Sequence, residues 1–142
     1  MVAISKIIPF FLMILILTAV PLEAANLSRE SAALIATGKW LGLIDAGNYT
    51  ESRDKAAESF RKAVTPEQWR QSLQTVREPL GKLFLRRVKT KTYTTSLPGL
   101  PDGEYVVIEF DTFFEYKQSA IETVTSVLER DGQWKVIGYS LN

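Results

Sequence analysis

Residues 104–116 read EYVVIEFDTFFEY, and large apolar side chains recur there at every second position. An alternation of this kind is typical of a β-strand with one buried face, because successive side chains point to opposite sides of a sheet. Similar stretches, rich in β-branched and aromatic residues, occupy residues 82–95, 120–130 and 133–141. The second half of the chain therefore predicts four consecutive strands.

The connections between these stretches are short, which favours an antiparallel sheet whose sequence neighbours lie side by side. Asp131 and Gly132 predict a two-residue hairpin turn before the last strand, and KQSA at residues 117–120 predicts a longer turn before the third. The first connection, SLPGLPDGEY at residues 96–105, holds two prolines and two glycines. These residues predict a stiff turn that sets the strand register, with contact to a partner as the alternative.

The register of the first two strands follows from their charges. If Lys89 faces Asp111 and Lys91 faces Glu109, opposite charges pair across the strands. The same register gathers apolar side chains on the other face, with Arg86 among them. This predicted inner face comprises Phe84, Val88, Val106, Ile108, Phe110, Phe114 and Tyr116.

The sequence does not show which face of the last two strands is buried, because a two-residue turn at 131–132 gives them two partly apolar faces. One face would hold Trp134, Val136, Val127 and Glu129, and the other Ile137, Tyr139, Val124 and Leu128. Either this part of the sheet is covered on both sides or one side meets a partner.

Upstream of Gly81 the apolar residues recur at helical spacing instead. A first helix is predicted from residue 26 to the segment DAGNY at residues 45–49, where glycine and asparagine favour a helix end. Its apolar stripe comprises Leu34, Thr37, Trp40, Leu41 and Ile44. A second helix is predicted with Thr50 as its cap and an apolar stripe of Ala57, Phe60 and Val64.

A third helix begins with the clearest local signal in the chain, TPEQ at residues 65–68. Thr65 is the predicted cap, Pro66 suits the first helical position and Gln68 completes a capping box. The helix carries an apolar stripe of Trp69, Leu73, Val76 and Leu80, and Pro79 with Gly81 is predicted to end it. Helices followed by an antiparallel meander predict an α+β fold, with the N-terminal helices packed on one face of a four-stranded sheet.

The N-terminal residues 1–25 have the layout of a secretory signal peptide. Lys6 precedes an apolar run from Ile7 to Val20, and the small residues Ala24 and Ala25 follow. A membrane anchor is the alternative, but it needs about 20 apolar residues and this run is shorter. We therefore expect a cleaved signal, a periplasmic or secreted bacterial protein without a stable membrane span, and a single domain at residues 26–142.

The composition excludes several kinds of chemistry. The chain contains no cysteine and no histidine, so disulfides, serine–histidine triads and the usual zinc sites are impossible within it. The formal net charge of +1 gives no reason to expect nucleic acid binding, which depends on clustered cations. We expect no metal and no cofactor.

Three segments carry a family resemblance: KWLGLIDAGNY at residues 39–49, LPGLPDGEY at 97–105 and DGQWKVIGY at 131–139. In them the chain resembles the domain-of-unknown-function family 4019 of exported bacterial proteins. The resemblance implies a nuclear-transport-factor-two-like fold, in which a bent sheet wraps around helices as a cystatin-like cone. Dimerisation through the outer sheet face is a further implication, and no activity is implied. Arg53 departs from the family pattern, where tryptophan is expected.

A cone of this class commonly holds a pocket between sheet and helices, and two carboxylates are candidates for it. Glu122 would be a general base with a raised pKa if buried alone, a structural ion pair if it meets Arg86, or a solvated side chain. Asp45 would either bond nearby backbone at the helix end or act in catalysis. These are weak catalytic candidates.

Candidate binding residues are the arginines and aromatics predicted near this pocket. Arg77 would either bind an anion or interact with the carbonyls at a helix end. Aromatic side chains, including Trp69, Tyr105 and Trp134, would line the pocket or form the core. The predicted binding set is Trp40, Tyr49, Arg77, Arg86, Phe114, Glu122 and Tyr139.

The sequence favours a non-enzymatic binding or interaction domain, with a small apolar ligand or a periplasmic protein as its partner. The alternative is a small lyase or isomerase that uses Glu122 or Asp45 together with Tyr139. That alternative requires a perturbed carboxylate in a real cavity, whereas side chains filling the cone would argue against it.

Overall fold

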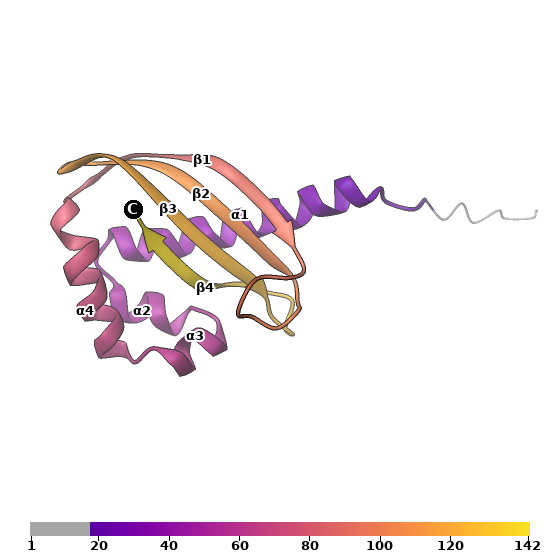
Figure 1. Ribbon diagram of the computed structural model, residues 1–142, viewed down its shortest axis with the longest axis horizontal. Helices are drawn as coiled ribbons and strands as arrows, with labels where there is room; N and C mark the ends of the chain where they lie inside the picture. Colours follow the sequence, from indigo (N-terminus) through magenta and orange to yellow (C-terminus); the bar gives the residue numbers. More distant parts are fainter. Residues whose placement is uncertain (1–17) are drawn as a thin grey trace, which may run out of the picture.

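The computed structural model describes residues 18–142, in which helices precede a four-stranded sheet (Figure 1). The predicted signal peptide lies largely in residues 1–17, outside the described residues. Within the described part, no helix is both long and apolar enough to cross a membrane. The helical elements are α1 (Leu22–Asp45), α2 (Tyr49–Asp54), α3 (Glu58–Ala63), α4 (Pro66–Val76) and the 3₁₀ turn η1 (Glu78–Leu80). The strands are β1 (Leu83–Thr94), β2 (Tyr105–Phe114), β3 (Lys117–Leu128) and β4 (Trp134–Leu141).

The strands form one antiparallel sheet in the order β1-β2-β3-β4, as predicted, and the sheet is open. It bends around α1, which contacts all four strands, while α2, α3 and α4 lie together beside it (Figure 1). The buried side of α1 is Ala33, Thr37, Trp40, Leu41 and Ile44. The predicted α+β class is confirmed.

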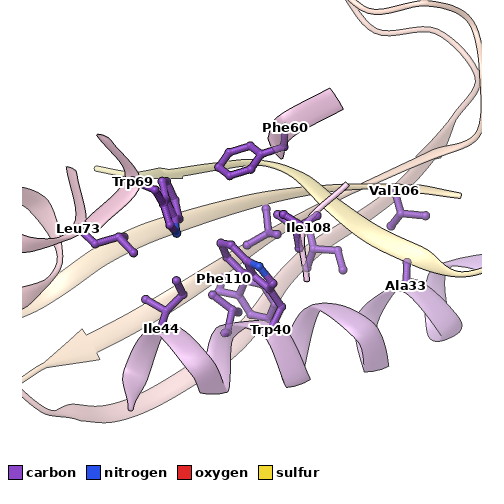
Figure 2. Close-up of a cluster of buried hydrophobic side chains, with 13 residues drawn as sticks. Ala33, Trp40, Ile44, Phe60, Trp69, Leu73, Val106, Ile108 and Phe110 are labelled. Atoms are coloured by element: carbon purple, nitrogen blue, oxygen red, sulfur yellow. The ribbon is translucent and has the colours of Figure 1, made fainter. Parts of the chain in front are cut away.

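Aromatic side chains from both layers fill the space between helices and sheet (Figure 2). The ring centroids of Trp40 and Trp69 lie 6.1 Å apart, and those of Phe60 and Trp69 lie 5.1 Å apart. The ring centroids of Tyr139, in β4, and Trp40 lie 5.5 Å apart in an edge-on arrangement. Contacts of this geometry stabilise a core beyond the area that they bury. Trp40, Trp69 and Tyr105, three of the predicted aromatic residues, are buried in the domain.

The predicted second helix is wrong in its extent and its cap. Two short helices, α2 and α3, replace it, and Asn48 rather than Thr50 precedes α2. Between them the backbone N–H of Ala57 donates to the carbonyl of Val136 on the edge of β4, at 2.8 Å. This bond to the sheet replaces a helical one, so the helix is interrupted there. Arg53 caps α3, because its guanidinium donates to the carbonyls of Arg61 and Val64.

The capping box at the start of α4 is confirmed. The hydroxyl of Thr65 accepts from the backbone N–H of Gln68, whose side chain accepts from the N–H of Thr65. The helix ends at Val76, and Pro79 lies in the separate turn η1. The chain then changes direction at Gly81, which has φ 74° and ψ −150°.

Replacing Gly81 with alanine should lower the free energy of unfolding by about 2–3 kcal/mol, because the backbone conformation there is nearly restricted to glycine. A Cβ at this position would also lie 2.8 Å from the ring of Tyr116. Gly42→Ala in α1 is the matched control, since a Cβ there meets nothing within 4 Å. In urea denaturation we expect Gly42→Ala to be neutral or stabilising by up to about 1 kcal/mol. Equal losses in both variants would contradict the account of Gly81.

The predicted register of β1 and β2 is wrong. Arg87 faces Asp111 and Thr90 faces Glu109, with register shifts at Leu83/Leu85 and Val88/Thr90. Each extra residue interrupts the alternation of faces. Arg86 keeps its inner position opposite Thr112. Of the predicted inner face, Val106, Ile108, Phe110 and Phe114 are buried, whereas Phe84, Val88 and Tyr116 are exposed.

The two later turns also differ from prediction. Phe114 pairs with Lys117, so the turn before β3 is Glu115–Tyr116 and the KQSA segment begins the strand. The last hairpin bonds Glu129 N–H to the carbonyl of Gln133 around Gly132, whose φ of 80° suits a three-residue turn. The added residue changes the predicted faces.

The buried inner residues of the last hairpin follow from this turn. Val136 faces Ser126 and is buried, and Trp134 faces Leu128, instead of the predicted Val127 and Glu129. An irregularity at Thr125/Ser126 then restores the predicted pairing of Tyr139 with Val124.

Internal hydrogen bonds hold the connection between β1 and β2. The N–H of Gly103 donates to the carbonyl of Thr95 (3.0 Å). The hydroxyl of Tyr105 donates to the backbone carbonyl of Pro101 (2.5 Å). Gly99 adopts the positive φ of 77° that a tight turn requires. These bonds agree with a turn that sets the strand register.

Candidate functional site

A cluster of charged side chains joins α1, β1 and β3 at the inner face of the sheet. The guanidinium of Arg86 donates to both carboxylate oxygens of Asp45, at 2.7 and 3.0 Å. It also donates to both oxygens of Glu122, at 2.7 and 3.2 Å. Arg86 is therefore shared between two carboxylates, each held by two hydrogen bonds. Bidentate pairs of this kind fix the relative orientation of the side chains in addition to pairing their charges.

Glu122 is fully buried, so the predicted solvated alternative is wrong and the predicted ion pair with Arg86 is present. Its carboxylate also accepts from the hydroxyls of Thr112 (2.7 Å) and Tyr139 (2.5 Å). Burial raises the pKa of the Tyr139 hydroxyl well above its ordinary value, and the neighbouring charge of Glu122 adds to this. Tyr139 is thus held in its protonated, donating form.

Burial opposes the charge of Arg86, but the hydrogen bonds that it donates to Asp45 and Glu122 outweigh this effect and raise the pKa of Arg86 above its ordinary range. The cluster thus keeps one guanidinium permanently charged between two carboxylates. Its hydrogen-bond donors and acceptors are directed at one another.

Arg77 is a second buried guanidinium beside the cluster. It donates to Asp45 at 3.3 Å and to the carbonyl of Gly81 at 2.7 Å, and it lies over the ring of Phe114 at 4.4 Å. Its Nε has no hydrogen-bond partner among the described residues. The carbonyl that Arg77 bonds belongs to Gly81, beyond the end of α4, and not to the last carbonyls of the helix that were predicted. Asp45 bonds these arginines rather than the nearby backbone that was predicted.

Replacing Tyr139 with phenylalanine should lower the free energy of unfolding at pH 7 by about 1.5–3 kcal/mol, the usual worth of a hydrogen bond to a charged group. The unfolded chain releases its tyrosine protons near pH 10, whereas the raised pKa keeps this one bound in the folded state. The stability from Tyr139 is therefore complete below about pH 10 and is lost as the pH rises towards the folded pKa.

The gap between the native protein and Tyr139→Phe should thus narrow above about pH 10, by up to 1.4 kcal/mol per pH unit. Thr112→Val is the matched control, because Thr112 donates to the same carboxylate but does not titrate in this range. The loss of unfolding free energy in Thr112→Val should therefore stay constant with pH. Denaturant unfolding from pH 7 to 11 measures both gaps, and parallel curves would contradict the account of Tyr139.

Sequence reasoning found most of this cluster but missed Thr112 within it, and it also missed Ser52 in the core. Thr112 was detectable, since it alternates with the apolar residues of its strand. Ser52 gave no signal, although both buried indoles depend on it. Trp40 Nε1 donates to its carbonyl (2.7 Å) and Trp69 Nε1 to its hydroxyl (2.9 Å). These bonds fix the indoles within the core.

Several pockets open on the surface of the part of the chain from residue 18 to residue 142, among them the following three. One of about 580 Å³ lies beside the charged cluster, and its lining includes Asp45, Tyr49 and Arg77. A second of about 640 Å³ lies between α1 and β4. The third, of about 580 Å³, lies between the β1–β2 connection and the last hairpin. Tyr49, predicted as a binding residue, lines the first pocket together with Asp45 and Arg77.

The sequence from Ala36 in α1 to Tyr139 in β4 matches the family described as Protein of unknown function (DUF4019). The chain belongs to this family. The resemblance drawn from the sequence motifs is therefore confirmed. The DUF4019 match includes every member of the charged cluster, from Asp45 to Tyr139. A comparison with curated proteins finds no match for the chain.

Proposed function

We propose that this DUF4019 chain is an exported binding or interaction domain that holds a small apolar ligand or a partner protein and does not catalyse a reaction. The observation that carries this proposal is the state of Glu122. Its carboxylate is fully buried and accepts hydrogen bonds from Arg86, Thr112 and Tyr139. A general base must reach a substrate proton, and this carboxylate faces only its own donors.

The filled interior supports the same proposal. The rings of Trp40, Trp69 and Tyr139 pack against one another where a cone would otherwise hold a ligand. Asp45, the other catalytic candidate, is held by two arginines. Binding would therefore take place on the outside of the domain, at its open pockets or its exposed apolar side chains. Exposed examples are Phe84, Leu85, Val88, Phe113 and Tyr116.

Native mass spectrometry of the protein, purified from the compartment that receives it, tests the proposal. We expect a bound small molecule or a defined complex with another protein. Glu122→Gln provides the control for catalysis, because it removes the charge but keeps the shape of the side chain. If the native protein converts a retained compound and Glu122→Gln does not, the enzyme alternative is correct and the proposal fails.

Export is tested separately by the mass of the mature chain. If residues 1–25 form a cleaved signal, the protein recovered from the periplasm or medium should begin near Asn26. An intact chain retained in the membrane fraction would instead favour the anchor alternative.

A further inference from the structure

We propose that the groove between α1 and β4 binds a small amphipathic anion, meaning an apolar body that carries one negative charge. This inference rests on the proposed binding function and names the site and the ligand class. The groove, called here the α1–β4 groove, has a volume of about 640 Å³. Its lining includes Ile35, Lys39, Leu43, Lys55, Trp134 and Val136. Pockets for small molecules commonly have volumes of about 300–1,000 Å³.

The α1 side of the groove is a mostly apolar helix face that also carries Lys39. Ala32, Ile35, Ala36 and Leu43 recur at helical spacing beside the buried stripe of the helix, and all line the groove. Ile35 is 63% exposed, although it lies in a well-packed domain. Trp134 and Val136 of β4 form the opposite wall. An apolar body placed here would remove this surface from water.

The charges around the groove favour an anion. Asp54 is paired with Arg53, and Lys135 lies near both Glu129 and Asp131. Lys39 and Lys55 form no salt bridge within residues 18–142, and Glu51 is the remaining unpaired carboxylate of the lining. Two unpaired ammonium groups against one carboxylate leave an excess of positive charge beside the apolar side chains of the groove. An amphipathic anion complements both features.

A small molecule fits this groove better than an added peptide strand. Strand addition needs free backbone groups along the sheet edge. On β4 the carbonyl of Val136, a residue of the groove lining, already accepts from the N–H of Ala57, so this part of the sheet edge is occupied. The occupant is thus expected to contact side chains rather than to extend the sheet.

Two fluorescent probes with one aromatic body test the ligand class. 8-Anilinonaphthalene-1-sulfonate carries a permanent negative charge, and 1-anilinonaphthalene lacks it. We expect the native protein to bind the sulfonate more tightly, by about fivefold to tenfold, with the advantage reduced at high salt. Binding is followed by the rise in probe fluorescence, and thermal unfolding of each variant confirms that it is folded.

Three variants locate the site. Lys39→Glu combined with Lys55→Glu should weaken sulfonate binding by about tenfold and leave the uncharged probe almost unaffected. Ile35→Gln should weaken both probes. Lys89→Glu, on the exposed part of β1, is the matched control and should change neither.

Equal affinity for the two probes, or sulfonate binding that survives the double lysine variant, would overturn the inference, as would the absence of binding by either probe. Those results would leave the proposed function intact, since it is judged by the molecules or proteins that the native protein retains. Retention of nothing in that separate experiment would instead count against the proposed function.

Discussion

Replacing Arg86 with methionine is expected to lower the free energy of unfolding by about 3–5 kcal/mol, the range observed when one partner of a buried ion pair is removed. The guanidinium is the only cation that bonds Glu122 among the described residues, and the Glu122 side chain has no exposure. Without it, the buried carboxyl group of Glu122 would have no cation and would keep only two hydroxyl donors. Asp45 would lose two of its three bonds to arginine.

A double variant separates the effect of leaving Glu122 without its cation from the effect of losing the Arg86 side chain itself. Adding Glu122→Gln to Arg86→Met removes the uncompensated charge, so part of the lost stability should return. Arg87→Met, at the neighbouring exposed position of β1, is the control and should lie within about 0.5 kcal/mol of the native protein. Guanidinium chloride denaturation measures all three. A loss below 1 kcal/mol for Arg86→Met would show that the cluster contributes little to stability.

Trp40→Ala should lower the free energy of unfolding by about 3–5 kcal/mol, as large-to-small changes of buried aromatics do. The indole is 4% exposed and packs against Trp69 and Tyr139. Its loss would create a cavity between helices and sheet. It would also leave the carbonyl of Ser52 without the donor that it now has at 2.7 Å.

Trp134→Ala is the matched control, because it deletes the same side chain from a half-buried position at the edge of the sheet. We expect a clearly smaller loss there, since water can fill the space that is left. Urea denaturation of both variants gives the comparison. If Trp134→Ala cost as much as Trp40→Ala, the aromatic cluster would not be the centre of the core.

Features encoded within one element were predictable from the sequence. The alternation of β2 identified its buried face, and the box formed by Thr65 and Gln68 identified the start of α4. The inner position of Arg86 was also correct, because it is opposite Thr112 on the inner face of the sheet. Each of these depends on a spacing of a few residues, which the sequence displays directly.

Features that depend on other elements were not predictable. Between the β1–β2 connection and Thr90 the register already differs by one residue from the prediction, since Lys91 faces Ile108. The bulge between Val88 and Thr90 then leaves Lys89 without an opposite residue, and no residue type marks it. The interruption between α2 and α3 depends on a bond from Ala57 to β4. Asp45 meets Arg86 only because the end of α1 lies over the sheet. In the candidate site, therefore, the members were predicted better than their pairings.

The packing of α1 against all four strands of the bent sheet has a consequence for the timing of folding. Trp40, near the start of the domain, completes its packing against Tyr139, in the last strand. The hydroxyl of Thr37 likewise bonds that of Ser126 across 89 positions of sequence. Contacts between such distant positions make a chain slow to fold, because a long loop must close first. The chain cannot complete its core until its C-terminal residues have been synthesised, so the native packing around Trp40 forms only after β4 has left the ribosome.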